Sequence, residues 1–474
     1  MHAPPHSSGA DARRPWSALV VLSVAQFMVV LDITVVNVAL PSIGQDLGIA
    51  GADLQWVVTI YVLLTGGLLL LGGRIADVLA RRAVFLAGLS LFTAASLASG
   101  LAGSGTMLIA ARAAQGIGAA LLTPAALSIV TSYYTGAQRA KALGAWSAIG
   151  SAGAAVGVVL GGMLTTWLSW EWIFLVNVPI GVGAALLALR VLPAMPAGAG
   201  ARALDVPGAL LVVTGLVVLV YAIDGAPDHG WGSARTLALG ALALALLAAF
   251  ARFEARTRAP LVPPAIWRVR SLIAGAAVLL GVTGILVGTF FLNSLYMQGV
   301  NGASALETGL GFLPLALAIG VAAHFASAVM PRVGSRVLVA AGLVLTAAGA
   351  LGLAAAPDRA AYAGDILPGL LAIGFGTGLV FPGVSVTAMS RIEPHQAGLA
   401  AGLLSTAHEL GAALGVAVLA AVAAIGDVAG AAGIAAGYED GFVAAGAIAL
   451  VLAAIAVAAV PSVRPEGAAQ AMAH

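Results

Sequence analysis

The sequence has few charged residues and no cysteine. Only 8% of its 474 residues are charged and 61% are hydrophobic, whereas an ordinary soluble domain is about 25% charged. A chain that is threaded repeatedly through lipid needs long apolar segments and little charge. The lack of cysteine excludes disulfides, thiolate metal sites and cysteine nucleophiles. The composition therefore predicts a polytopic membrane protein.

Lysine is almost as scarce as cysteine, which excludes one class of energy source. The single Lys141 follows Ala140, so the Gly-Lys-Ser/Thr core of a phosphate-cradling loop does not occur. "GFGTGL" at 374–379 imitates a dinucleotide fingerprint, but it lies inside an apolar stretch and follows no strand. We therefore expect neither an enzyme nor an ATP-driven pump, and no cofactor, nucleotide or nucleic acid. The excess of arginine over lysine, with abundant alanine, suggests a GC-rich bacterial gene.

Apolar stretches long enough to cross a bilayer recur fourteen times, which predicts an all-α protein. They are Trp16–Leu40, Leu54–Gly73, Ala83–Leu101, Thr106–Thr131, Leu143–Thr166, Trp172–Leu192, Val206–Ile223, Thr236–Phe253, Leu272–Leu295, Thr308–Met330, Val337–Ala356, Gly364–Ser390, Gly398–Ile425 and Gly441–Val460. With both termini inside, 18 of the 21 Lys and Arg residues fall on the cytoplasmic side, as the positive-inside rule requires. We expect a multi-pass protein of the bacterial inner membrane with both termini cytoplasmic.

The chain resembles itself at an offset of roughly 256 residues, in the manner of transporters built from structural repeats. "GIGAALLTPA" (116–125) matches "GFGTGLVFPG" (374–383), and "SAGAAVG" (151–157) matches "ELGAALG" (409–415). The offset corresponds to eight spans, so spans one to six repeat as nine to fourteen. This predicts a disordered tail (1–15), an N-terminal six-helix bundle (16–195), two inserted helices with linkers (196–270), a C-terminal six-helix bundle (271–462) and a second tail (463–474).

Asp32 is a carboxylic acid in the middle of the first apolar span. It lies about 16 residues, or roughly 24 Å at 1.5 Å per residue, from the expected cytoplasmic end. A charged group there costs roughly 2.5–3.5 kcal/mol to insert even on a lenient scale, and such groups are functional by default. We expect Asp32 to couple transport to protons or substrate; the alternative is an ion pair that serves only packing.

Several motifs resemble those of a known family. They are "LDITVVNVALP" (31–41), "LQWVVTIYVL" (54–63), "GGRIADVLARR" (72–82), "RAAQGIGAALLTPA" (112–125), "GAAVGVVLGG" (153–162) and "LSWEWIFLVNVPIG" (168–181). The chain is similar over nearly its whole length to the fourteen-helix drug:proton antiporters of the major facilitator superfamily. Val78, Ala80 and Val158 differ from that family's pattern.

The resemblance implies roles for three groups of residues. Arg112 would face the first helix and take part in proton transfer with Asp32, although snorkelling to headgroups is an alternative. The loop motif residues would latch the two halves together in one state; they are Gly73, Asp77, Arg81 and Arg82. The antiporter motif of the fifth helix contributes a stripe of small residues, for which close helix packing is the default reading; they are Gly153, Gly157, Gly161 and Gly162.

Glu409 is a second acid inside an apolar span. It is either a second proton-coupling site, a counter-charge for a cationic substrate, or an acid that reaches a polar helix end. The adjacent His408 more simply fills a hydrogen-bonded role. Polar candidates for lining the substrate cavity are Gln26, Asn37, Gln115, Asn293 and Tyr296. These readings favour a proton-coupled exporter of small amphipathic organic compounds, with a proton-coupled solute importer of the same superfamily as the alternative.

Overall fold

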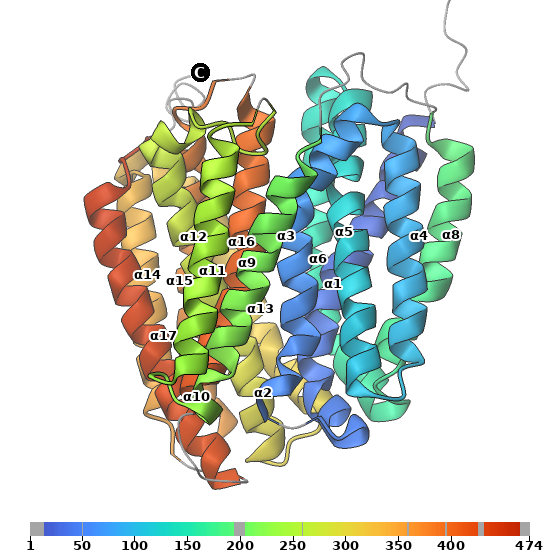
Figure 1. Ribbon diagram of the computed structural model, residues 1–474. Coiled ribbons are helices and arrows are strands. Elements are labelled where there is room, and N and C mark those ends of the chain that lie inside the picture. Colours follow the sequence, from blue (N-terminus) through green and yellow to red (C-terminus); the bar gives the residue numbers. More distant parts are fainter. Residues whose placement is uncertain are drawn as a thin grey trace, which may run out of the picture.

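The computed structural model describes residues 14–49, 51–193, 204–257, 259–357, 360–393, 396–424 and 431–464, and these are almost entirely helical (Figure 1). The expected tails and the first inserted linker fall largely outside this part of the chain. The α-helices are α1 (Arg14–Leu47), α2 (Gly51–Leu54), α3 (Trp56–Val78), α4 (Arg81–Gly100), α5 (Gly105–Tyr133), α6 (Gly136–Trp167), α7 (Trp172–Leu175), α8 (Asn177–Val191), α9 (Val206–Asp224), α10 (Ala226–His229), α11 (Ala234–Glu254), α12 (Arg270–Gly299), α13 (Ala305–Val333), α14 (Ser335–Ala354), α15 (Leu367–Met389), α16 (Ala397–Ala423) and α17 (Ala431–Ala459). Two short helical segments, Ile266–Arg268 and Tyr362–Ile366, precede α12 and α15.

The fourteen expected spans all fall in helices. Within the described residues, 13 helices are long and apolar enough to cross a membrane. The remaining expected span, Leu143–Thr166, lies in α6, whose 32 residues include the apolar stretch Ala155–Trp167. Several helices are longer than expected: α1 continues through Pro41 to Leu47, and α17 begins at Ala431, well before the expected start at Gly441. These helices continue past the apolar spans into polar residues because helical backbone hydrogen bonds are satisfied within the helix itself.

The two bundles repeat the same helix contacts. A Cβ added to Gly116 of α5 would lie 2.6 Å from the Tyr61 carbonyl oxygen of α3, and one added to Gly118 would lie 2.7 Å from the Phe92 nitrogen of α4. In the second bundle, a Cβ added to Gly374 of α15 would lie 2.6 Å from the Leu315 carbonyl oxygen of α13. One added to Gly376 would lie 2.5 Å from the Gly342 carbonyl oxygen of α14. The repeated glycines therefore let α5 and α15 approach their two neighbours closely, which explains why these letters recur in the sequence.

The inserted helices α9 and α11 pack on each other, and α9 lies along α3 and α16. At one end, the Asp224 carboxylate of α9 accepts hydrogen bonds from Gln55 and, at 2.7 Å, from Trp56 Nε1 at the start of α3. At the other end, Arg74 of α3 donates to the Pro260 carbonyl oxygen at 3.1 Å, in the linker before α12. The insertion is thus hydrogen-bonded to the first bundle near both ends of α3.

Within the described part of the chain, hydrogen bonds join α1 and α6 of the first bundle to α12 and α13 of the second, toward the end where α1 and α6 finish. Ser294 Oγ donates to the Asn37 carbonyl oxygen at 2.7 Å, and Gln298 Nε2 donates to that of Val38 at 2.9 Å. The backbone nitrogen of Leu306 donates to Thr166 Oγ1 at 3.1 Å. The opposite end holds the α3–α4 connection with Arg81 and Arg82. The bundles are therefore tied together at the end remote from these arginines.

Candidate transport site

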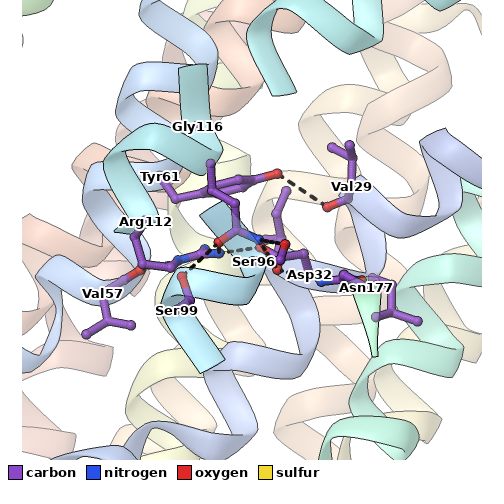
Figure 2. A network of polar contacts seen from close by, with 12 residues as sticks. Val29, Asp32, Val57, Tyr61, Ser96, Ser99, Arg112, Gly116 and Asn177 are labelled. Atoms are coloured by element: carbon purple, nitrogen blue, oxygen red, sulfur yellow. Dashed lines mark hydrogen bonds and ion pairs between the residues drawn. The ribbon is translucent and has the colours of Figure 1, made fainter. Parts of the chain in front are cut away.

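Asp32 and Arg112 form an ion pair inside the first bundle. Arg112 Nη1 of α5 donates to Asp32 Oδ2 of α1, and both side chains are completely buried. Figure 2 shows the two side chains meeting between helices. Arg112 therefore does not snorkel to the headgroups. The pair keeps two opposite charges together at a depth where either alone would be strongly unfavourable.

Two amides complete the partners of the Asp32 carboxylate. Gln115 Nε2 donates to Asp32 Oδ1 at 2.8 Å, and Asn177 Nδ2, at the start of α8, donates to the same oxygen at 3.2 Å. Gln115 also accepts from Arg112 Nη1 at 2.8 Å and donates to Ser96 Oγ of α4 at 2.8 Å. The carboxylate thus sits in a network supplied by α1, α4, α5 and α8.

The Arg112 guanidinium is oriented by α3. Its Nε donates to the Val57 carbonyl oxygen at 2.9 Å, and its central carbon lies 4.2 Å from the centre of the Tyr61 ring (Figure 2). A ring face attracts a guanidinium, the more so when both are desolvated. Tyr61 is itself held by its hydroxyl, which donates to the Val29 carbonyl oxygen at 3.5 Å. The arginine therefore has a fixed direction toward α1.

The network is not fully satisfied. Arg112 Nη2 and Asn177 Oδ1 are buried and have no hydrogen-bond partner. Buried polar groups are nearly always paired, so each unpaired one needs an explanation. An added proton on Asp32 would turn an acceptor into a donor, and Asn177 Oδ1 lies on a side chain that already reaches this carboxylate. The geometry therefore leaves room for a rearrangement of hydrogen bonds when the charge of Asp32 changes.

The glycine stripe of α6 faces α1 on either side of Asp32. A Cβ added to Gly153 would lie 3.3 Å from the Phe27 ring, and one added to Gly161 would lie 2.8 Å from Val35 Cα. Gly157 faces Thr34 and the Leu31 carbonyl oxygen in the same way. Gly162 turns instead to α13, where its Cβ would be 2.7 Å from the Ala305 carbonyl oxygen. Close helix packing is therefore what the stripe provides here.

The four residues expected in a gating loop all lie in helices. Gly73 and Asp77 belong to α3, which continues to Val78, and Arg81 and Arg82 open α4. Only Leu79 and Ala80 separate the two helices. Asp77 is exposed. Arg82 donates to the Leu189 carbonyl oxygen of α8 at 2.5 Å, within its own bundle. A latch between the bundles stays a prediction.

The five cavity candidates are dispersed. Gln115 belongs to the Asp32 network. Asn293 and Tyr296 are buried in the second bundle: Asn293 accepts from Tyr438 at 3.0 Å, and Tyr296 donates to the Pro357 carbonyl oxygen at 2.8 Å.

The remaining two candidates lie on α1. The Asn37 amide nitrogen donates to the Ile33 carbonyl oxygen at 2.9 Å. Gln26 Oε1 and Asn37 Oδ1 are buried and unpaired. These positions do not form one cluster, and contact with substrate stays a prediction for each of them.

Glu409 lies where the two bundles meet, on α16. A Cβ added to Gly66 of α3 would be 2.6 Å from the Glu409 Cβ, so the two helices touch at this point. His408 points to a different neighbour, because Thr283 Oγ1 of α12 lies 3.1 Å from its Nδ1. Glu409 does not contact the Asp32–Arg112 pair, from which it is separated by α3.

Sequence reasoning missed Asn177, Ser96 and Tyr61 as members of the network. Asn177 lies in "LVNVPIG", within the motif at 168–181, and its amide inside an apolar span could have indicated a polar contact. Ser96 gives no such signal, because serines in membrane helices commonly bond their own backbone. Tyr61 gives no signal either, because its contact with Arg112 depends on the packing of α5 against α3.

We expect Arg112→Lys to fold but to transport poorly. Lysine keeps the charge beside Asp32, but it lacks the Nε donor to Val57 and the planar fork that reaches Gln115. A hydrogen bond that involves a charged group contributes about 1.5–3 kcal/mol, so we expect transport to fall roughly tenfold or more. Initial transport rates in vesicles measure this, with the exposed Arg391→Lys as the matched control. Equal rates for both variants would show that only the charge of Arg112 matters.

A membrane-spanning chain of two alike helical bundles, with an ion pair buried between the helices of one bundle, has the architecture of a secondary transporter. The family comparison agrees: residues 22–416 match the model of the Major Facilitator Superfamily, and the chain belongs to that superfamily. The superfamily and the relatives below are transporters and not enzymes.

The similar proteins are bacterial antibiotic resistance and export proteins. The chain is 43% identical to the puromycin resistance protein pur8 of Streptomyces alboniger, over 87% of this chain and 82% of that protein. It is 42% identical to the cephamycin export protein CmcT of Amycolatopsis lactamdurans, over 93% and 91% of the two chains. Among solved structures, a peptide transporter POT in complex with sulfate has a TM-score of 0.69 at 16% identity, covering 93% of this chain and 94% of its own. This last likeness concerns the fold alone.

Proposed function

We propose that this protein exports small amphipathic organic compounds of the antibiotic type in exchange for protons, by alternating access. The observation that carries the proposal is the buried Asp32–Arg112 pair with its amide partners. A titratable carboxylate at membrane depth is a means of carrying protons. Each proton that moves inward gains about 2.3 kcal/mol per 100 mV of membrane potential, in addition to the pH gradient.

The proposed proton step exchanges partners around Asp32. While ionised, the carboxylate holds Arg112, Gln115 and Asn177, and so holds α1 against α5 and α8. Protonation removes the charge that Arg112 compensates and weakens the attraction between α1 and α5. Because α1 also packs on α6 and is bonded to α12 at its far end, a shift of α1 bears on both bundles. The loop motif at Asp77, Arg81 and Arg82 would latch the bundles together in the alternative state.

The names of similar proteins support the proposed direction and kind of substrate. Puromycin, cephamycin and lincomycin appear in the names of resistance or export proteins that are 43%, 42% and 36% identical to this chain. The positive-inside pattern supports an orientation with the Arg81 end and both termini in the cytoplasm. In that orientation the hydrogen bonds between α1, α6, α12 and α13 lie toward the outer side of the membrane.

The test uses the full-length protein in everted membrane vesicles, in which the lumen is acidified by respiration. We expect puromycin or a cephamycin to accumulate in the lumen and the pH gradient to decrease as it does so, because protons leave in exchange. A fluorescent pH probe and a filtration assay with labelled substrate record the two fluxes. A protonophore should abolish the accumulation.

The importer alternative gives the opposite result in the same vesicles. Substrate loaded into the lumen would then leave together with protons, and none would accumulate against its gradient. That outcome would overturn the proposed direction while leaving proton coupling intact. Accumulation that persists with the protonophore would overturn proton coupling itself.

A further inference from the structure

We infer that Asp205 and Glu254 share one proton and so form a second proton-binding site, which fastens the inserted helices to the linker that precedes α12. Asp205 lies directly before α9, which begins at Val206, and Glu254 is the last residue of α11. The site is separate from Asp32 and goes beyond the proposed exchange of substrate for protons. Its ligand is the proton, and its role is to make this end of the insertion sensitive to pH.

One oxygen of Asp205 is buried without a donor. Asp205 is 5% exposed and Glu254 is 4% exposed. Asp205 Oδ1 accepts a hydrogen bond from the Gly208 backbone nitrogen at 2.9 Å and thereby caps α9. The other oxygen, Oδ2, has no donor among the described residues. A buried acceptor costs free energy until a group donates to it, so this oxygen needs an explanation.

Glu254 uses both of its oxygens to hold the linker. Oε1 accepts from the Leu261 backbone nitrogen at 3.2 Å, and Oε2 accepts from that of Val262 at 3.0 Å. Leu261 and Val262 are themselves buried in the hydrophobic core. The Glu254 side chain also lies within hydrogen-bonding reach of Asp205. Two ionised carboxylates offer only acceptors, so this contact requires a proton on one of them.

No basic side chain replaces that proton in the part of the chain that the structure describes, where neither carboxylate forms an ion pair. Arg74 of α3 donates to the Pro260 carbonyl oxygen instead. The other described charged residues near this end of the insertion and of α3 and α16 are exposed: Asp77, Arg252, Arg256, Arg268, Arg270, Arg391 and Glu393. Tyr61, His408 and Glu409 lie within the spans of α3 and α16, and Tyr221, Asp224, Asp228, His229 and Arg235 lie at the opposite end of the insertion. Arg202, Arg258 and His395 lie outside the described residues.

Two acids that share a buried site cannot both ionise easily. The second negative charge is disfavoured by burial and by the first charge, so one proton is held more tightly than on an isolated acid. This proton also supplies the donor that Asp205 Oδ2 lacks. One shared proton therefore accounts both for the contact between the two acids and for the unpaired oxygen.

The linker connects the pair to the first bundle. Pro260 directly precedes the two residues that Glu254 holds, and its carbonyl oxygen accepts from Arg74 Nη2 at 3.1 Å. Arg74 lies three residues before Asp77, in the motif that is expected to latch the bundles. While the proton is bound, Glu254 and Arg74 hold the same short segment from two sides. Loss of the proton leaves two buried charges that repel, which loosens the segment from α11 and from α3.

The sign of the pH effect follows from which form is stable. The protonated pair is intact at low pH, and the contact is lost as the pH rises through the titration of the pair. The proposed orientation puts this end of the insertion in the cytoplasm. The pair would then respond to the pH of the compartment into which the proposed exchange delivers protons.

The test measures hydrogen–deuterium exchange of the linker amides by mass spectrometry on the purified full-length protein. Asp205→Asn keeps the oxygen that caps α9 and puts a permanent N–H donor in place of Oδ2, so it should hold Glu254 at every pH. We expect the wild-type linker to exchange like that of Asp205→Asn at about pH 6 and roughly tenfold faster at about pH 8.5. Comparison at equal pH cancels the intrinsic pH dependence of exchange. The exposed Asp228→Asn, in the same insertion, should match the wild type at both.

A second variant keeps the inference testable if Asp205→Asn does not fold. Glu254→Gln donates permanently to Asp205 but keeps only one acceptor for the linker, so its linker should be less protected by the same factor at both pH values. If the wild type and Asp205→Asn exchange alike at the higher pH, the pair releases no proton there and the inference is wrong. If Asp205→Asn exchanges faster at the lower pH, Asp205 acts only as an ionised cap. If either variant keeps the wild-type pH dependence, another group titrates. The experiment needs neither substrate nor a proton gradient, so its outcome is independent of the test at Asp32.

Discussion

Asp32→Asn should abolish substrate accumulation against a gradient in everted vesicles, while exchange of labelled for unlabelled substrate without a gradient persists. Asparagine has nearly the shape of aspartate and can still accept from Gln115 and Asn177, but it neither binds nor releases a proton near neutral pH. Coupling to the proton gradient is therefore lost, whereas the movements that carry substrate across remain possible. Uphill accumulation and gradient-free exchange are measured on the same vesicles.

The substitution also leaves Arg112 without its counter-charge, which needs its own control. Breaking a buried ion pair by removing one partner typically costs about 3–5 kcal/mol of stability. The double variant Asp32→Asn with Arg112→Gln removes both charges and should recover thermal stability without recovering accumulation. Asp32→Glu keeps a titratable acid and should retain part of the accumulation. If Asp32→Asn still concentrates substrate at the wild-type rate, the proposed proton site is wrong.

Much of the fold could be predicted from this sequence because the positions of apolar runs and basic residues determine membrane topology. Lipid allows only closed hydrogen-bonding structures, so each apolar run of sufficient length had to be a helix, and the arginine clusters fixed where the turns lie. The repeat around Gly116 and Gly374 could be predicted for a related reason. A glycine at a close helix contact cannot be replaced without moving a backbone, so both copies kept it and the bundles remained recognisable as alike.

The site could be predicted only in part. A charged residue such as Asp32 or Arg112 inside an apolar span stands out, and its partner follows because few others exist. The uncharged members do not stand out: Asn177 comes from the sixth span and Ser96 from the third, and their approach to Asp32 depends on how the helices rotate about their axes. The same limit explains Asn293 and Tyr296, whose polar groups are occupied by Tyr438 and by the loop at Pro357 within their own bundle.

These observations suggest how the two bundles divide the work. The first bundle holds the Asp32–Arg112 pair in its interior, sealed from the seam by α3. In the second bundle the repeat offset puts Leu370 at the position that corresponds to Arg112, and Glu409 of α16 packs against Gly66 of the same α3. The proposed proton site and Glu409 thus contact the same helix, the first through Val57 and Tyr61 and the second through Gly66.

Gly161→Ala should lower both thermal stability and transport, because it separates the two helices that position Asp32. The added methyl group would lie 2.8 Å from Val35 Cα and 2.9 Å from the Val35 carbonyl oxygen. Both are backbone atoms, so no side-chain rotation relieves the clash, and α1 must move away from α6. Overpacking of this kind costs about 1–3 kcal/mol. Because Val35 is less than one turn from Asp32, the same movement shifts the carboxylate away from Arg112 and Asn177.

The matched control is Gly144→Ala, in the same helix. A Cβ at Gly144 meets nothing within 4 Å, so this change should leave both properties near wild type or slightly raise helix stability. The melting temperature in detergent and the rate of substrate accumulation in everted vesicles measure the two effects. If Gly161→Ala matched the control in melting temperature and accumulation rate, α1 and α6 could separate at this contact without loss of stability or transport. The position of Asp32 would then be set by its hydrogen bonds to α5 and α8 alone, and the glycine stripe would have no part in holding the proton site.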